Sequence, residues 1–147
     1  MQVLIDGDGC PVVNIAVRLC RQEKVPCLIF CDTAHSIDRE GARTIVVDKG
    51  ADSADFALVN LLQPGDRVVT QDYGLASMCL ARGARVMNQD GMEYTNENID
   101  MLLTFRHEAA RIRRGGGHLL GPKKRTSRQD WEFESKFLPF IRGSLDE

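Results

Sequence analysis

Aspartate residues recur in this chain just after short apolar runs, at positions where a buried strand would end. Five of them stand out by this placement: Asp6, Asp8, Asp52, Asp55 and Asp72. Clustered carboxylates repel one another, so some must stay protonated unless a cation compensates their charge. Mg²⁺ and Mn²⁺ prefer hard oxygen ligands, and such an ion activates water and neutralises charge on a phosphodiester. The chemistry predicted is therefore metal-dependent hydrolysis without a nucleophilic serine or cysteine.

Each of these acids also has a purely structural interpretation. Asp52 caps a helix in that view, and the helix dipole favours Asp55 in the first turn. Asp8 stands beside two glycines, as turn residues often do. Asp6 and Asp72 are harder to explain in this way, because each follows a buried strand. We therefore expect Asp6, Asp52, Asp55 and Asp72 to be catalytic metal ligands, and Asp8 to be an accessory metal ligand.

The elements that must position these acids alternate along the chain. Nearly unbroken aliphatic runs, which are typical of strands buried on both faces of a parallel sheet, cover residues 3–6, 27–31, 44–48, 67–70 and 84–88. Helical spacing of apolar residues predicts helices at 11–24, 52–62, 73–81, 96–114 and 127–137. In a doubly wound α/β sheet everything that follows a strand lies at one edge, where ligands bind. With strand order 3-2-1-4-5, Asp6 and Asp72 face one crevice.

Local signals at the helix ends make the expected boundaries more specific. Pro11 suits the first position of the first helix, because proline lacks the N–H that is unsatisfied there. Ser127 and Asp130 resemble a capping pair at the start of the last helix. We expect Trp131, on that helix, to be a core residue; alternatively Trp131 and Tyr73 stack on a base.

Charge is unevenly distributed along the 147 residues. Residues 1–105 carry a net charge of −6 and residues 106–147 one of +4. The basic part forms a glycine-rich loop and a C-terminal helix, and it predicts contacts with the phosphates of a nucleic acid, RNA more than DNA, through Arg113, Arg114, Lys123, Lys124, Arg125 and Arg128. Solvent exposure alone, or contact with the acidic body of a second copy in a homo-oligomer, is the alternative.

Composition narrows the class of protein. The length fits one domain, and no apolar run approaches the length of a transmembrane helix, so we expect no membrane partner. Five cysteines without a CxxC pair, together with the lack of a signal peptide, predict a cytoplasmic protein without disulfides. Neither GxGxxG nor a P-loop motif supports a nucleotide cofactor.

The chain resembles the YaiI/YqxD family of bacterial proteins over essentially its whole length, in the segments LIDGDGCPV, VVDKGADSAD, GDRVVTQDYGLA, ARVMNQDGMEYTNENID and RRGGGHLLGPKKRTSRQD. This family is grouped with PIN-like domains, the fold of many metal-dependent ribonucleases. The resemblance implies a single PIN-like domain, a three-layer α/β/α fold with a parallel 3-2-1-4-5 sheet. It matches the family's acids with Asp6, with Asp52 or Asp55, and with Asp72.

Three functions stay open at this point. The first is a Mg²⁺- or Mn²⁺-dependent endoribonuclease-like hydrolase. The second is a PIN-like nucleic-acid-binding or regulatory module with little turnover, because no acid follows Asp72 until Asp90. The third is a phosphohydrolase of the haloacid-dehalogenase type, which the Asp6-x-Asp8 pair favours. That family needs a threonine two residues past its second aspartate, where this chain has Cys10.

Overall fold

The aliphatic runs form one six-stranded sheet in the computed structural model, which describes residues 1–32, 37–48, 53–114 and 124–143. The strands are β1 (Val3–Asp6), β2 (Cys27–Asp32), β3 (Arg43–Val47), β4 (Arg67–Val69), β5 (Arg85–Met87) and β6 (Glu93–Tyr94). Their order is 3-2-1-4-5-6, and all neighbours are parallel except β5 and β6. The expected α/β class and strand order are confirmed, with a short antiparallel strand added at one edge.

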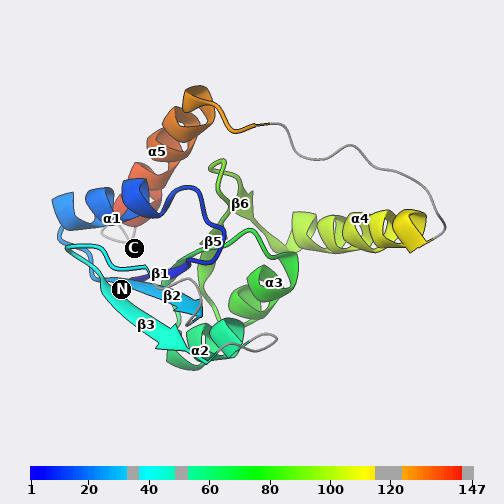
Figure 1. The fold of residues 1–147 in the computed structure, drawn as a ribbon, viewed down its shortest axis with the longest axis horizontal. Coiled ribbons are helices and arrows are strands. Elements are labelled where there is room, and N and C mark those ends of the chain that lie inside the picture. The colour runs from blue at the N-terminus through cyan, green and yellow to red at the C-terminus, as the bar shows by residue number, and fades with distance from the viewer. Residues whose placement is uncertain (33–36, 49–52, 115–123, 144–147) are drawn as a thin grey trace.

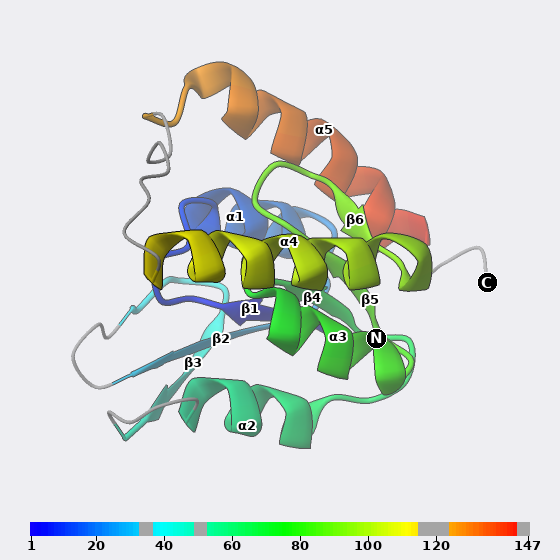
Figure 2. The same ribbon diagram turned by 90° about the vertical axis from the view of Figure 1, so that its right-hand side faces the viewer.

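Helices cover both faces of this sheet and give three layers (Figures 1 and 2). The helices are α1 (Val13–Gln22), α2 (Ser53–Leu61), α3 (Tyr73–Ala81), α4 (Asn96–Arg114) and α5 (Ser127–Arg142). Figure 2 shows α1 and α5 on one side of the sheet, and α2 and α3 on the other. Helix α4 packs along α3. No helix in the described ranges is long and apolar enough to cross a membrane.

Alternate residues of the central strands point to opposite faces of the sheet and belong to two separate hydrophobic cores. Val3 and Ile5 of β1 point into the core under α1 and α5, while Leu4 points into the core under α2 and α3. The first core includes Phe133 and Phe137 of α5, whose rings stack with their centroids 5.0 Å apart. Because both sides of the central strands are buried, both sides must be apolar. This arrangement explains why the aliphatic runs are nearly unbroken.

The sequence-based start of α1 is wrong, whereas α5 begins at Ser127 as expected and only its predicted capping pair is wrong. Pro11 lies in the turn before α1, and the N-cap residue is Val12, so Pro11 is not the first helical residue. At α5 the cap is Thr126 rather than Ser127. Thr126 accepts a hydrogen bond from the Gln129 backbone N–H, and the Gln129 side chain accepts one from the Thr126 backbone N–H. This reciprocal capping box lies one residue before the predicted pair.

Helix α5 also continues past its predicted end at residue 137. Pro139 lies inside α5, where a proline costs about 3 kcal/mol. Beyond it, however, Phe140 and Ile141 are buried in the first core. Burying two such side chains contributes roughly 1.5–3 kcal/mol each, which exceeds the cost of the proline. Tertiary packing therefore determines where this helix ends.

Candidate functional site

An open pocket lies at the carboxyl ends of the neighbouring strands β1 and β4. The chain places β2 and β3 on one side of β1 and the later strands on its other side, so this is the topological switch point of the sheet. It encloses about 360 Å³ and is lined by Asp6, Asp8, Gln71, Asp72 and Tyr73. Strands β1 and β4 are parallel neighbours with Ile5 opposite Val69, so the residues that follow them meet at one edge. Three of the five predicted carboxylates, those of Asp6, Asp8 and Asp72, thus come together at the switch point of the sheet.

A buried threonine joins two of these acids. The Thr70 hydroxyl donates to Asp6 Oδ2 at 2.8 Å and accepts from the Asp72 backbone N–H at 3.0 Å. Thr70 is only 1% exposed. Asp72 in turn caps α3, because its Oδ1 accepts from the N–H groups of Gly74 and Leu75. Asp72 also lines the pocket, so one carboxylate serves both the helix and the pocket.

The loop after β1 is held in place from both sides. Asp8 accepts from the backbone N–H of Asp32, the last residue of β2, at 3.1 Å. A side chain on Gly7 would lie 2.9 Å from Ile29 Cγ2, so this loop approaches β2 too closely for any other residue without a shift. Gly9 has a φ of +72°, a conformation that glycine adopts without strain. Its carbonyl accepts from Gln71 Nε2 at 2.9 Å, which ties the β1 loop to the β4 loop.

The pocket is electrostatically unfavourable for its own carboxylates. Burial raises the pKa of Asp6, and the negative charges of Asp72 and Asp8 raise it further, while the hydrogen bond from Thr70 opposes the shift. A raised pKa means that the ionised form is disfavoured in the fold relative to water. A cation in the pocket would relieve both the repulsion and the loss of hydration.

Two predicted ligands lie elsewhere or outside the described residues. Asp55 is in the first turn of α2 and half-buried, but it is not among the residues that line the pocket. Its charge and that of Asp6 both act on Cys79 of α3, whose pKa burial and these charges raise to about 12. Asp55 therefore belongs to the side of the sheet that α2 and α3 cover (Figure 2). Asp52 falls outside the described residues.

The carboxylate oxygens of the pocket are ligands of the kind that a hard cation prefers, although they are not spaced closely enough to enclose an ion. Within residues 1–32, 37–48, 53–114 and 124–143, no three His, Cys, Asp or Glu side chains are grouped closely enough to hold a metal ion. The oxygens of Asp6, Asp8 and Asp72 nevertheless line a single polar pocket. Mg²⁺ commonly binds through one or two carboxylates and keeps several water molecules, so this set of ligands fits it.

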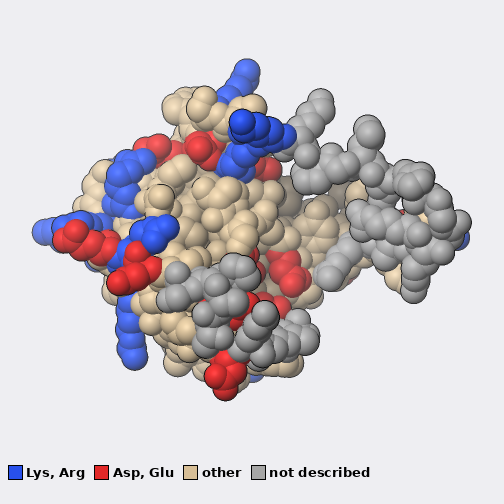
Figure 3. All heavy atoms as spheres, in the orientation of Figure 1, with Lys and Arg blue, Asp and Glu red and all other residues tan. Residues whose placement is uncertain are grey.

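The predicted nucleic-acid-binding residues divide into three groups. Arg113 and Arg114 are the last residues of α4, and their side chains, like all of Lys123, lie outside the described part of the structure. Lys124 and Arg128 are exposed. In the space-filling view, basic side chains gather over the N-terminal end of α5, at the top of the molecule (Figure 3). The arginine between them, Arg125, behaves differently.

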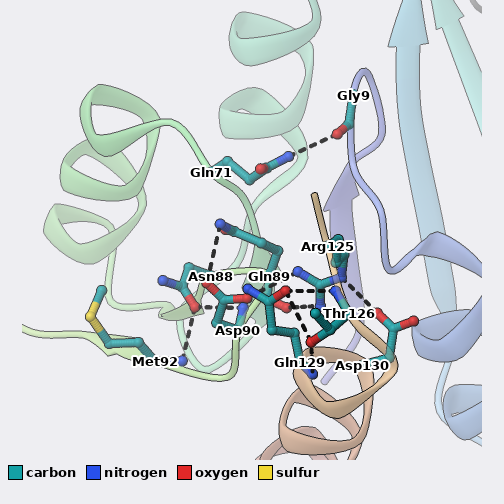
Figure 4. A network of polar contacts seen from close by, with 10 residues as sticks. All are labelled: Gly9, Gln71, Asn88, Gln89, Asp90, Met92, Arg125, Thr126, Gln129 and Asp130. Carbon is teal, nitrogen blue, oxygen red and sulfur yellow. Dashed lines mark hydrogen bonds and ion pairs between the residues drawn. The ribbon is translucent and has the colours of Figure 1, made fainter. Parts of the chain in front are cut away.

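Arg125 uses its guanidinium inside the protein. Its Nε donates to Asp130 at 2.6 Å, its Nη1 to Asp90 at 2.9 Å, and its Nη2 to the Gln89 carbonyl at 2.7 Å (Figure 4). The side chain is only 20% exposed. These contacts tie the start of α5 to the turn between β5 and β6, next to the acidic pocket. The charge that was predicted to meet phosphate is thus already matched by two carboxylates.

Two more residues of the site differ from the sequence-based expectations. Trp131 is 65% exposed on α5, so its expected place in the core is wrong, and stacking on a base stays a prediction. Thr70 and Gln71, which organise the pocket, had not been identified as site residues. One signal was present: Thr70 is a polar residue that follows Val68 and Val69 at the end of a strand and directly precedes the Gln71-Asp72 pair.

The fold and the site define an α/β protein with a carboxylate pocket at the switch point of a mostly parallel sheet. Residues 4–143 match the model of a protein family described as "Uncharacterized BCR, YaiI/YqxD family". The chain belongs to this family, as the resemblance of its motifs implied.

Curated relatives extend over nearly the same length. A UPF0178 protein of Exiguobacterium sibiricum is 53% identical over 146 residues, which cover 99% of this chain and 100% of the relative. Another, of Clostridium acetobutylicum, is 45% identical, with 99% and 100% covered. A third, of Ruminiclostridium cellulolyticum, is 44% identical, with 97% and 93% covered. No solved structure matches the chain in the corresponding comparison.

Proposed function

We propose that this protein is a divalent-metal-dependent nuclease that hydrolyses phosphodiester bonds in RNA or DNA. The observation that carries the proposal is the meeting of Asp6, Asp8 and Asp72 in one open pocket at the switch point of the sheet. These residues come from two loops that are 64 positions apart but are joined through Thr70. A cation in the pocket would offset the repulsion between these acids, beyond the structural bonds that Asp8 and Asp72 make.

Asp6 and Asp72 would hold Mg²⁺ or Mn²⁺, with Asp8 as an accessory ligand. When bound, the ion supplies an activated water and neutralises charge on the scissile phosphate. Thr70 fixes the orientation of the Asp6 carboxylate through its 2.8 Å hydrogen bond. The capping role of Asp72 in α3 keeps that carboxylate at the mouth of the pocket. Asp55 does not line the pocket and Asp52 lies outside the described residues, so their part as further ligands stays a prediction from the sequence.

The exposed basic side chains at the start of α5 support a polyanionic substrate. Lys124 and Arg128 lie close in sequence to Arg125, which is anchored to the turn beside the pocket. We expect RNA rather than DNA, a cytoplasmic location in accordance with the free cysteines, and binding that weakens as salt is added. Arg113, Arg114 and Lys123 would extend this contact.

The test is cleavage of labelled single- and double-stranded RNA and DNA in the presence of Mn²⁺. Asp6→Asn and Asp72→Asn keep the size of the side chain, and asparagine still caps a helix well. Each variant should lose at least a hundredfold in rate, while Asp100→Asn on the exposed side of α4 should cleave normally. Cleavage that survives in both pocket variants would come from a contaminant and would remove the basis of the proposal.

A binding module without turnover is the second candidate. The specific observation in its favour is that the described carboxylates are not grouped closely enough for one ion. This candidate predicts retention of RNA with a strong dependence on salt, and no cleavage under any metal condition. Calorimetric titration of Mn²⁺ into the protein separates the nuclease from the binding module. The nuclease should bind Mn²⁺ through Asp6 and Asp72, whereas the binding module needs no metal ion.

A further inference from the structure

A second cavity adjoins the acidic pocket and shares a wall with it. It encloses about 320 Å³ and is lined by Gly9, Pro11, Gln71, Gln89, Asp90, Arg125 and Gln129. Gln71 lines both cavities, and its bond to the Gly9 carbonyl marks the border between them. Figure 4 shows this side chain reaching toward Gly9 above the network of Arg125 and Gln129. A volume of this size falls within the range of small-ligand sites, at the low end.

The charges of the second cavity do not suit a phosphate. Arg125 is the one cationic side chain that lines it within the described residues, and this guanidinium is paired with Asp90 and Asp130. Asp90 itself lines the cavity and would repel an anion. The balance of charge is therefore neutral to negative. This property distinguishes the cavity from a phosphate site and favours an uncharged, polar ligand.

Three carboxamides give the cavity its hydrogen-bonding character. Gln129 Oε1 accepts from the Thr126 backbone N–H at 2.8 Å, so the Gln129 amino group is the part that can donate to a ligand. Gln71 has the opposite polarity, because its amino group donates to Gly9 and its oxygen is the part that can accept. Gln89 supplies a third amide at the rim. A wall with both donors and acceptors matches the edge of a nucleobase.

We infer that this second cavity is a nucleobase subsite, which binds the base of the nucleotide whose phosphate occupies the acidic pocket. The inference rests on the proposed nuclease function and specifies its substrate. The edge of a base that these amides would contact is engaged in pairing within a duplex, so the substrate is an unpaired nucleotide. Arg125 is a positioning residue here, because it holds Gln89 and the start of α5 at the two sides of the cavity.

The inference is tested without any cleavage by NMR of the full chain in the absence of metal. Adenosine, guanosine, cytidine and uridine serve as probes, and ribose 5-phosphate serves as the phosphate-bearing control. We expect at least one nucleoside to shift the side-chain amide signals of Gln71, Gln89 and Gln129, and ribose 5-phosphate to leave those of Gln89 and Gln129 unchanged. Shifts produced equally by ribose 5-phosphate, or by no nucleoside, would overturn the assignment.

Gln129→Glu is the sharpest variant, because a carboxylate still accepts from Thr126 in the capping box while the amino donor is lost. The nucleoside that binds should bind about fivefold more weakly, the equivalent of one neutral hydrogen bond. Gln89→Met keeps the backbone carbonyl that Arg125 contacts and should show a similar loss. The matched control is Gln22→Glu, an exposed glutamine at the far end of α1. Equal affinity in all three variants contradicts the subsite.

The outcomes separate this inference from the nuclease proposal. If the Gln129 and Gln89 variants cleave RNA with unchanged base preference and nucleosides shift no amide, the subsite is wrong although the nuclease stands. If nucleosides bind as expected and no nucleic acid is cleaved, the nuclease proposal fails and the base subsite remains. Cleavage of single strands with a preference that Gln129→Glu weakens supports both.

Discussion

Replacing Thr70 with valine removes one hydroxyl oxygen and keeps the shape of the side chain. That oxygen donates to Asp6 Oδ2 at 2.8 Å and accepts from the Asp72 N–H at 3.0 Å, in a position that is 1% exposed. The substitution therefore breaks two hydrogen bonds at once. It leaves a half-buried carboxylate without one of its donors and a backbone N–H without its acceptor.

The expected loss of stability follows from these two bonds. A hydrogen bond to a charged group contributes about 2 kcal/mol, and a partly buried N–H left without an acceptor costs about 1 kcal/mol. The free energy of unfolding should therefore fall by about 3 kcal/mol. For a chain of this size, that change lowers the midpoint of thermal unfolding by roughly 6–12 °C.

Urea unfolding at pH 7 measures the loss, and Thr44→Val provides the matched control. Thr44 is a half-buried threonine on β3 whose hydroxyl donates only to the neutral carbonyl of Ile37. Its replacement should cost about 1 kcal/mol, the contribution of one ordinary hydrogen bond. Equal losses in the two variants would refute the view that Thr70 joins two acids of the pocket.

The effect of Thr70→Val on stability should also depend on pH. Burial raises the pKa of Asp6 in the folded protein, and the Thr70 hydrogen bond opposes this rise because it stabilises the ionised form. The bond therefore contributes stability at a pH above the folded pKa of Asp6. This contribution is lost as the pH falls through that pKa. The stability difference between wild type and Thr70→Val should accordingly shrink in acid, and a constant difference would contradict the assigned bond.

Three further changes test other parts of the structure. Asp6→Asn should raise the thermal midpoint of the metal-free protein at pH 7, because the raised pKa of Asp6 makes its charge destabilising above that pKa; added Mn²⁺ should narrow the gap. Arg67→Met should lower the free energy of unfolding in urea by about 3 kcal/mol, because the buried carbonyl of Phe140 and the partly buried carbonyl of Gly65 each lose a donor. The same change at exposed Arg82 should have little effect. Lys24→Gly should stabilise the protein by about 0.5 kcal/mol, because Lys24 has a φ of +58°, which glycine adopts without strain. Gln22→Gly, at the last helical position of α1, should destabilise it in the same assay.

The fold was largely predictable because its signals are local and repeated. Aliphatic runs and amphipathic segments predicted the observed bounds of β1, α3 and α4. The order of the first five strands was implied by the family resemblance, and the structure has the same order. Strand β6 was missed because it has two residues, too few for a period to appear. The end of α5 was missed because the contacts of Phe140 and Ile141 with the sheet, rather than the sequence around Pro139, decide it.

The site was predictable only in part, since side-chain pairing depends on distant contacts. The convergence of Asp6 and Asp72 followed from the rule that residues after parallel strands share an edge. The partners of Arg125 could not be foreseen in that way, because Asp90 is 35 positions away in sequence and no rule of sheet topology brings the two segments together. Arg125 was therefore predicted to bind phosphate because it lies in a basic segment, although its guanidinium is paired with Asp90 and Asp130.

The division of the interior into two cores affects how the chain can fold during synthesis. Strands β1 and β2 emerge from the ribosome early, but part of the apolar cover for their α1 face comes from Phe133, Phe137, Phe140 and Ile141 of α5. Until those residues are made, a strip of valine and isoleucine stays in contact with water. Long-range contacts of this kind slow folding and prolong the exposure of surfaces that aggregate. A nascent chain that stalls before α5 should therefore depend on chaperones far more than the finished protein does.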